Sequence, residues 1–144
     1  MYRSVRGFIE VFLVHPGGPF FKNKDVGAWT LPKGLQEKDE DLLLTAQREF
    51  EEETGIKPLG PYFDLGTTRL KSGKVIYAWA FETEAERVTL QSNTFTMEWP
   101  PRSGKQQTFP EVDKADFFNL EQAREKLNEA QGIFLDRLAQ SKRF

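Results

Sequence analysis

The alternation of apolar and polar residues divides the chain into strands and helices. A run rich in β-branched and aromatic residues over Phe8–Val14 predicts a strand, which ends at the Pro- and Gly-containing segment His15–Pro19. Over Lys74–Glu82, apolar residues occupy both alternating sets of positions, which predicts a central strand covered on both faces. Further along the chain, Phe117 and Phe118 predict a short strand.

Between the first two strands the apolar spacing changes to that of a helix. Asp39 is the expected N-cap, because its side chain can accept hydrogen bonds from the first turn, and Gly55 is the expected stop. The residues that predict the apolar stripe of this helix are Leu42, Leu43, Ala46 and Phe50.

A second helical region follows the short strand. Asn119 and Gln122 have the spacing of a capping box, and the helix that they begin is expected to run to about Ala130. Gly132 interrupts the pattern, which resumes over Ile133–Gln140.

The stretch Glu98–Pro110 contains three prolines, a glycine and several polar residues, and we expect it to be a long loop. No internal repeat, low-complexity tract or linker interrupts the chain. Strand, helix, strands and helix in this order predict an α/β fold in which helices cover the faces of a sheet.

Composition narrows the functional classes. The 144 residues suit one domain spanning 1–144, and 38% hydrophobic with 29% charged residues is typical of a globular protein. A net charge of -2 argues against general nucleic-acid binding, and the lack of cysteine excludes a thiolate nucleophile and a cysteine zinc site. The apolar run Phe8–Val14 is too short to span a bilayer and lacks the cleavage site of a secretory signal, so we expect no membrane partner and a cytoplasmic protein.

The predicted first helix carries a cluster of glutamates. Glu49, Glu52 and Glu53 share one face, because residues three and four apart lie side by side on a helix. No basic residue is expected on that face, and each like-charged pair costs an isolated helix about 0.2–0.5 kcal/mol. Carboxylates grouped in this way suit Mg²⁺ or Mn²⁺, although acidic helix faces are more commonly only solvated.

The spacing around this cluster is specific. The matching residues are Gly34, Glu40, Arg48, Glu49, Glu52, Glu53, Gly55 and Ile56. In this pattern the segment resembles the Nudix box at every charged and glycine position, and departs from it only at Phe50, where the family usually has Ile, Leu or Val. The resemblance implies an α/β/α sandwich with a mixed β-sheet. Because only about seven residues precede Phe8, the first strand of such a fold is expected to be shortened or missing.

The resemblance also implies roles for residues of the box. The implied metal ligands are Glu49, Glu52 and Glu53, any of which could be the general base. Arg48 is similar to the arginine that orients these glutamates through an ion pair. Glu40 resembles the box glutamate that is structural or acts in the outer shell. Gly34 stands where the loop entering the helix must turn.

The resemblance extends outside the box. Trp29–Gly34 is similar to the approach to the box in many diadenosine polyphosphate and nucleotide hydrolases, so Lys33 and Gly34 are candidate substrate contacts; the alternative for Lys33 is a solvated loop lysine. Phe109–Asp113 resembles the segment in which members place a further metal-binding glutamate, which makes Glu111 the candidate and an ordinary loop carboxylate its alternative. Phe109 and Tyr77 are candidates for stacking on a base.

These observations predict metal-assisted hydrolysis of a nucleotide substrate, with Mg²⁺ or Mn²⁺ as cofactor. The resemblance favours nucleoside polyphosphates or dinucleoside polyphosphates such as diadenosine tetraphosphate. Two other hypotheses remain: a Nudix module that binds nucleotides without cutting them, and an acidic helix at a protein interface. The complete glutamate set argues against the first, and divalent-metal binding would exclude the second. His15, the single histidine, is expected to have a structural role.

Overall fold

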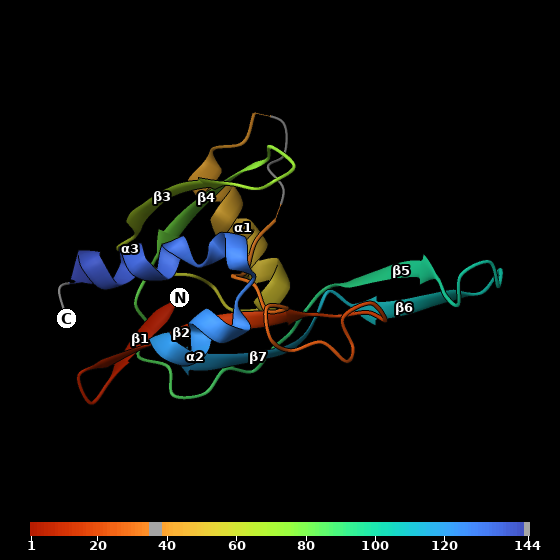
Figure 1. Cartoon of the computed structure of the whole chain (residues 1–144), viewed down its shortest axis with the longest axis horizontal. Helices are drawn as coiled ribbons and strands as arrows, with labels where there is room; N and C mark the ends of the chain where they lie inside the picture. The colour runs from red at the N-terminus through yellow and green to blue at the C-terminus, as the bar shows by residue number, and fades with distance from the viewer. Residues whose placement is uncertain (35–38, 143–144) are drawn as a thin grey trace.

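The computed structural model describes residues 1–34 and 39–142, and in these residues helices lie on both sides of the strands (Figure 1). Helix α1 (Leu42–Thr54) is on one side, and helices α2 (Leu120–Lys126) and α3 (Ile133–Lys142) are on the other. The strands are β1 (Tyr2–Val5), β2 (Phe8–Pro16), β3 (Phe63–Arg69), β4 (Val75–Ala80), β5 (Thr94–Glu98), β6 (Gln106–Pro110) and β7 (Val112–Asn119). The arrangement confirms the α/β class.

Strand β2 is the centre of an antiparallel sheet with the order β1-β2-β7. Its side chains alternate between two cores, as the pleat of a strand requires. Val11 and Leu13 are buried in the core that includes α2 and α3, whereas Phe12 and Val14 are buried in the core that includes Phe50 of α1. The strand covered on both faces is therefore β2.

The prediction that Lys74–Glu82 forms such a central strand was wrong. Within the described residues β4 pairs along its length only with β3, and Tyr77 is 48% exposed. Both faces are covered only where the strand ends, since Ala80 belongs to one core and Phe81 to the other. The apolar pattern identified a strand but could not show which strands lie beside it.

The first strand is present, although it has only four residues. In β1, Tyr2 pairs with Val11 and Val5 with Phe8 of β2. A parallel bridge joins Tyr2 to Glu82, with hydrogen bonds from the Tyr2 amide to the Phe81 carbonyl (3.0 Å) and from the Thr83 amide to the Tyr2 carbonyl (2.8 Å). This bridge connects the β3–β4 hairpin to the main sheet and introduces the parallel component of the strand arrangement.

Helix α1 begins two residues later than Asp39 suggested. Asp41 has extended backbone geometry, and its carboxylate accepts hydrogen bonds from the amides of Leu43 and Leu44. Asp39 instead has a φ of 61°, outside the helix. At the other end Gly55 has a φ of 74°, and its amide bonds the Glu51 carbonyl, as expected of a left-handed C-cap.

The C-terminal helices begin as predicted. Asn119 and Gln122 form the capping box of α2, but α2 ends at Lys126 because Leu127 turns to extended geometry. A 3₁₀ turn, η1 (Glu129–Gln131), leads to α3. No helix of the described residues is long and apolar enough to span a membrane.

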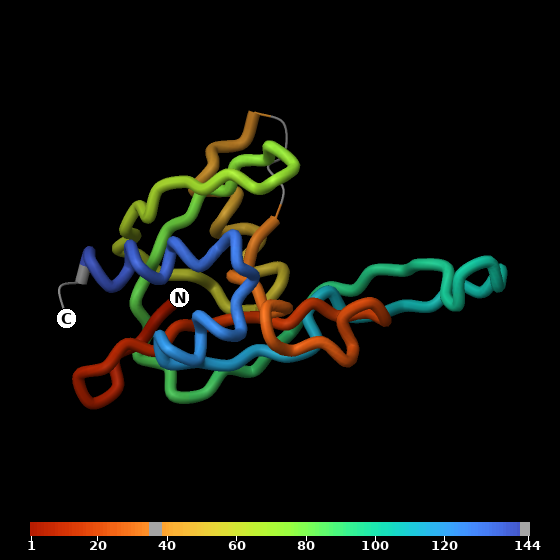
Figure 2. Tube along the Cα trace, viewed as in Figure 1, coloured from red at the N-terminus to blue at the C-terminus, as the bar shows by residue number. Residues whose placement is uncertain are grey.

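The region predicted as a long loop is a β-hairpin that projects from the body (Figures 1 and 2). In this hairpin Phe95 pairs with Phe109 and Thr96 with Thr108. The prolines do not disrupt it, because Pro100 lies in the turn and Pro110 is the last residue of β6. We call the hairpin Thr94–Pro110 the arm.

Candidate functional site

Arg48 organises the acidic side of α1. Its guanidinium donates two hydrogen bonds of 2.9 Å to the two carboxylate oxygens of Glu40, from Nε and from one terminal nitrogen. Glu40 Oε1 also accepts a hydrogen bond of 2.8 Å from the buried Thr45 hydroxyl. The paired geometry fixes the plane of the guanidinium, as bidentate arginine–carboxylate pairs do.

The remaining terminal nitrogen of Arg48 faces two of the clustered glutamates. It lies 2.9 Å from Glu49 Oε1 and 3.3 Å from both carboxylate oxygens of Glu52. The hydrogen bonds to Glu40, followed by those to Glu49 and Glu52, raise the pKa of Arg48. The expectation that no basic residue neutralises this face was therefore wrong, because Arg48 lies one helical turn before Glu52, at the i,i+4 spacing, and beside Glu49.

Glu53 is held from the opposite direction, by the loop before the helix. The backbone amide of Lys33 donates a hydrogen bond of 3.0 Å to Glu53 Oε2. The pKa of Glu53 is raised to about 7, mainly by burial; the Lys33 hydrogen bond opposes this shift, and the charges of Glu111 and Glu49 add to it. Burial also raises the pKa of Glu49, against the effect of Arg48.

Glu111 lies near the cluster although it is remote in sequence. Its charge contributes to the raised pKa of both Glu49 and Glu53. Asn93 provides the backbone connection: its amide bonds the Glu52 carbonyl at 3.2 Å, and its carbonyl accepts the Glu111 amide at 2.8 Å. Asn93 was not predicted from the sequence, since a residue that acts through its backbone leaves no side-chain signal.

Gly34 leaves space for the side chain of Glu49. A Cβ at this position would lie 1.9 Å from Cδ of Glu49, so any side chain would displace that carboxylate. The role expected from the sequence was a turn in the loop entering the helix. The part of that loop formed by residues 35–38 is outside the described residues, but the close approach to Glu49 is a separate reason for glycine.

The glutamates fit a divalent ion by their chemistry. They provide hard oxygen donors, the type that Mg²⁺ and Mn²⁺ prefer, and two of them are destabilised in the charged form by burial and also by neighbouring carboxylates. In the described residues no group of three His, Cys, Asp or Glu side chains has the arrangement of a ready-made metal site. The donor set therefore fits such an ion, whereas the ligand geometry is not preformed.

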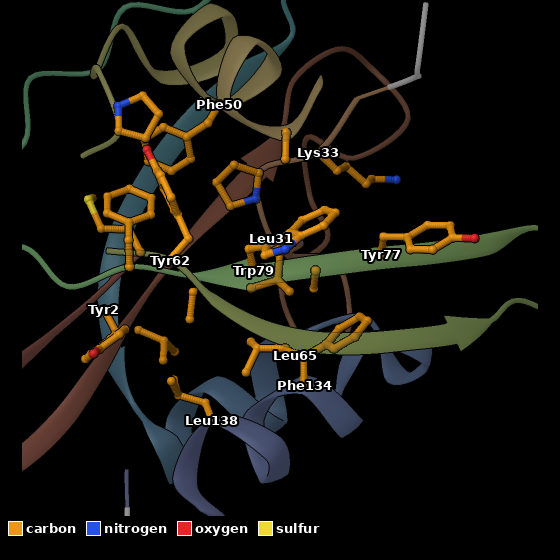
Figure 3. A pocket seen from close by; sticks show the side chains of 18 of the residues that line it. Tyr2, Leu31, Lys33, Phe50, Tyr62, Leu65, Tyr77, Trp79, Phe134 and Leu138 are labelled. Carbon is orange, nitrogen blue, oxygen red and sulfur yellow. The ribbon is translucent and has the colours of Figure 1, made fainter. Parts of the chain in front are cut away.

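On its other side α1 borders an apolar cavity of about 110 Å³ (Figure 3). Residues from α1, β4, α3 and the segment before α1 line it, among them Leu31, Lys33, Phe50, Tyr62, Tyr77, Trp79, Phe134 and Leu138. The Lys33 and Tyr77 side chains extend toward the same side of this cavity. Lys33 therefore belongs to both features, through its amide to the acidic cluster and through its side chain to the cavity.

Two other candidates lie outside the cavity lining. Phe109 is on the arm, where its ring packs 5.9 Å from that of Phe95, two residues before Glu111. His15 is fully buried; its Nδ1 lies 2.7 Å from Asp113 and its Nε2 lies 2.7 Å from the Lys24 carbonyl. These contacts tie the end of β2 to β7 and to the loop that follows β2, which is a structural role.

Comparison with known proteins identifies the family. A family model of the NUDIX domain matches residues 5–138, so the chain belongs to the Nudix family. The fold is accordingly the Nudix fold. No curated protein matches the sequence.

Solved structures share the fold at low identity. A Caenorhabditis elegans Ap4A hydrolase in a binary complex is 21% identical with a TM-score of 0.65, covering 99% of this chain and 93% of its own. The NUDIX domain of Shewanella oneidensis NrtR, complexed with ADP ribose, is 18% identical with a TM-score of 0.65. The match covers 99% of this chain and 83% of that chain. A MutT protein from Methanosarcina mazei is 22% identical with a TM-score of 0.59. The match covers 99% of this chain and 93% of that chain.

The raised pKa of Glu53 predicts that the free energy of unfolding, measured in the presence of a metal chelator, depends on pH. A folded-state pKa of about 7, against an ordinary value of 4.5, means that folding favours the protonated carboxyl. That stabilisation is complete below pH 4.5 and is lost as the pH rises through 7. The difference in free energy of unfolding, Glu53→Gln minus wild type, should therefore increase by roughly 2–3 kcal/mol as the pH rises from 5 to 8.

Urea unfolding of both proteins at several pH values measures this difference. Taking the difference between the two proteins cancels the contribution of titrating groups that do not interact with Glu53, and leaves that of Glu53 with its coupled neighbours Glu49 and Glu111. A difference that stays constant across the range would show that Glu53 has an ordinary pKa.

Proposed function

We propose that the chain is a Mg²⁺-dependent hydrolase, with Mn²⁺ as the other fitting ion, that cleaves a pyrophosphate linkage in a nucleoside or dinucleoside polyphosphate. The observation that carries the proposal is the position of Lys33, whose amide binds Glu53 while its side chain lines the apolar cavity. A substrate with an apolar planar group and an anionic phosphate chain matches these two adjacent environments.

The acidic cluster is the proposed catalytic end. Glu49, Glu52, Glu53 and Glu111 are the residues that would hold the metal. A bound divalent ion would neutralise charge on the phosphate oxygens and lower the pKa of a coordinated water. Arg48 acts by positioning, since its hydrogen bonds to Glu40 fix the nitrogen that holds Glu49 and Glu52. Gly34 contributes by leaving room for Glu49.

The cavity is the proposed binding end. Its lining is mainly apolar and aromatic, which suits a nucleobase. Tyr77 is 48% exposed and on the same side as Lys33, which supports the proposal that it stacks on a ring at the entrance. The Lys33 ammonium would then meet the phosphate chain between the base and the glutamates. Phe109, on the arm and near Glu111, is proposed to contact the substrate at the catalytic end.

The alternative is a nucleotide-binding Nudix module without hydrolytic activity. One structural neighbour was solved as a NUDIX domain bound to ADP ribose, which shows that the fold accepts a nucleotide-like ligand. A pure binder has no need for three glutamates held by Arg48 and Lys33. Magnesium-dependent release of phosphate-containing products, identified by mass, distinguishes an enzyme from a binder.

The first functional prediction concerns Glu52. Glu52→Gln preserves the shape of the side chain but removes the charge of a proposed ligand, so turnover in magnesium should fall at least about 100-fold. The fold should persist, because the Glu52 side chain is 42% exposed. Steady-state kinetics and a thermal melt measure both effects.

Glu51→Gln is the matched control, because it makes the same change one residue away at an exposed position of α1. Its turnover should remain near that of the wild type. Near-normal turnover of Glu52→Gln would contradict the proposed site.

The second functional prediction concerns the substrate. A polyphosphate chain with an adenine-like base fits the cavity and the cluster together, so diadenosine tetraphosphate or a related polyphosphate should be cleaved with a higher kcat/KM than nucleotide sugars. A panel of both classes, with products identified by mass spectrometry, provides the comparison. If a nucleotide sugar is clearly the best substrate, this assignment of substrate class is wrong.

The third functional prediction concerns Glu111. Because it follows the arm and lies beside Glu49 and Glu53, Glu111→Gln should lower kcat at least about tenfold while changing nucleotide affinity less than about threefold. Single-turnover kinetics and equilibrium binding separate these quantities.

Glu98→Gln is the control on the same arm, since the Glu98 carboxylate accepts the Arg102 amide in the turn, away from the cluster. It should have the smaller effect on kcat. A larger effect of Glu98→Gln than of Glu111→Gln would refute the role of Glu111.

A further inference from the structure

The arm has one apolar and one polar face. Phe95 and Phe109 are opposite each other in the pairing register, and Met97 is on the same face because strand side chains alternate. Thr96 and Thr108 are on the other face, where their hydroxyls lie 3.0 Å apart. A projecting hairpin that served only as a connection would have no need of an apolar face.

The loop after β2 extends this apolar face. A Cβ at Gly18 would approach the Phe95 ring to 2.8 Å, so the loop lies directly on the arm. Next to it, the Phe20 ring packs edge-on against Trp99 with centroids 5.5 Å apart. Phe20 is still 60% exposed. In the outer part of this apolar patch, formed by Phe20, Met97 and Trp99, the Phe20 ring is thus exposed, whereas Met97 and Trp99 are half-buried.

The edges of the arm are also open. Within the described residues β5 and β6 pair only with each other, and a two-stranded hairpin is marginally stable in water. Along these strands Glu98 is the single charged residue, so the edges lack the lysines that usually prevent strand association. Contact with another chain would stabilise the arm by covering the patch.

Charge favours one particular partner and orientation. The tip of the arm carries Arg102 and Lys105, both exposed. Its base carries the exposed Glu111, beside the glutamates of α1. If two copies align their arms antiparallel about a two-fold axis, each basic tip meets the acidic base of the other copy. A parallel alignment would bring the two basic tips together.

We propose that the arm is a self-association surface through which two copies of this chain form a symmetric dimer with antiparallel arms. The Phe20–Met97–Trp99 patches pack together at the centre, and Arg102 and Lys105 of each copy lie against the base of the other arm. This proposal concerns assembly and does not depend on the substrate, but the acidic base of the arm that it uses includes Glu111 and the α1 glutamates of the proposed metal site.

Sedimentation velocity over a range of concentrations tests the dimer. The wild type should dimerise, and its dissociation constant should increase with salt because the ends of the interface are charged. Phe20→Ser and the double variant Arg102→Glu/Lys105→Glu should each weaken dimerisation at least about tenfold. A wild type that stays monomeric up to about 100 μM at low salt overturns the proposal.

Matched variants elsewhere on the surface control for nonspecific effects. Phe8→Ser removes an aromatic ring that is 73% exposed at the start of β2, and Lys71→Glu/Lys74→Glu makes the same charge reversal in the turn between β3 and β4. Both should dimerise like the wild type. Because the reversed arm residues are exposed, the Arg102/Lys105 double variant should remain folded even if Phe20→Ser does not.

Cross-linking tests the orientation, and the natural lack of cysteine makes it direct. Ser103→Cys places one thiol at the tip, and Asn93→Cys places one at the base. A short bismaleimide should link the two variants to each other when they are mixed. Efficient linking of Ser103→Cys to itself would indicate parallel arms and overturn the antiparallel arrangement.

Discussion

Mutual repulsion among the carboxylates of Glu49, Glu52, Glu53 and Glu111 is the constraint around which this molecule is built. Three of these residues occupy less than two turns of α1, and the fourth is brought to them at the base of the arm. Without opposing interactions, such a group would loosen the helix that carries it. The opposing interactions come from three separate segments of the chain.

Each segment contributes a different kind of contact. Arg48 supplies positive charge and is itself held by Glu40. Lys33 supplies a backbone amide to Glu53, and Asn93 supplies an amide to the Glu52 carbonyl near the end of the helix. The pKa of Glu53 is nevertheless raised to about 7, so these contacts offset only part of the cost of burial. The remaining cost suits a site completed by a cation.

The sheet explains why these contacts meet at one place. Strand β2 sends Phe12 and Val14 toward α1, where Phe50 packs between Phe12 and Phe81 at ring-centroid distances of 6.2 and 5.2 Å. The family's aliphatic position is thus occupied by a ring that packs on two others. This packing places the apolar side of α1 over the cavity and leaves its acidic side facing Glu111.

The sequence alone determined what depends on local order along the chain. Helix spacing placed Glu49, Glu52 and Glu53 on one face, and the stop at Gly55 and the capping box at Asn119 are local features that the structure confirms. The family, and with it the α/β fold, followed from the spacing of charged residues and glycines. These inferences succeeded because each depends on residues within a few helical turns of one another.

Tertiary structure decided everything that depends on which segments become neighbours. It made β2 the central strand in place of Lys74–Glu82, and it paired Thr94–Glu98 with Gln106–Pro110 in an arm where prolines suggested a loop. It also brought Lys33 and Asn93 to the acidic helix through their backbone groups. Strand pairing and backbone hydrogen bonds do not depend on side-chain identity at the contact, and therefore a single sequence carries little record of them.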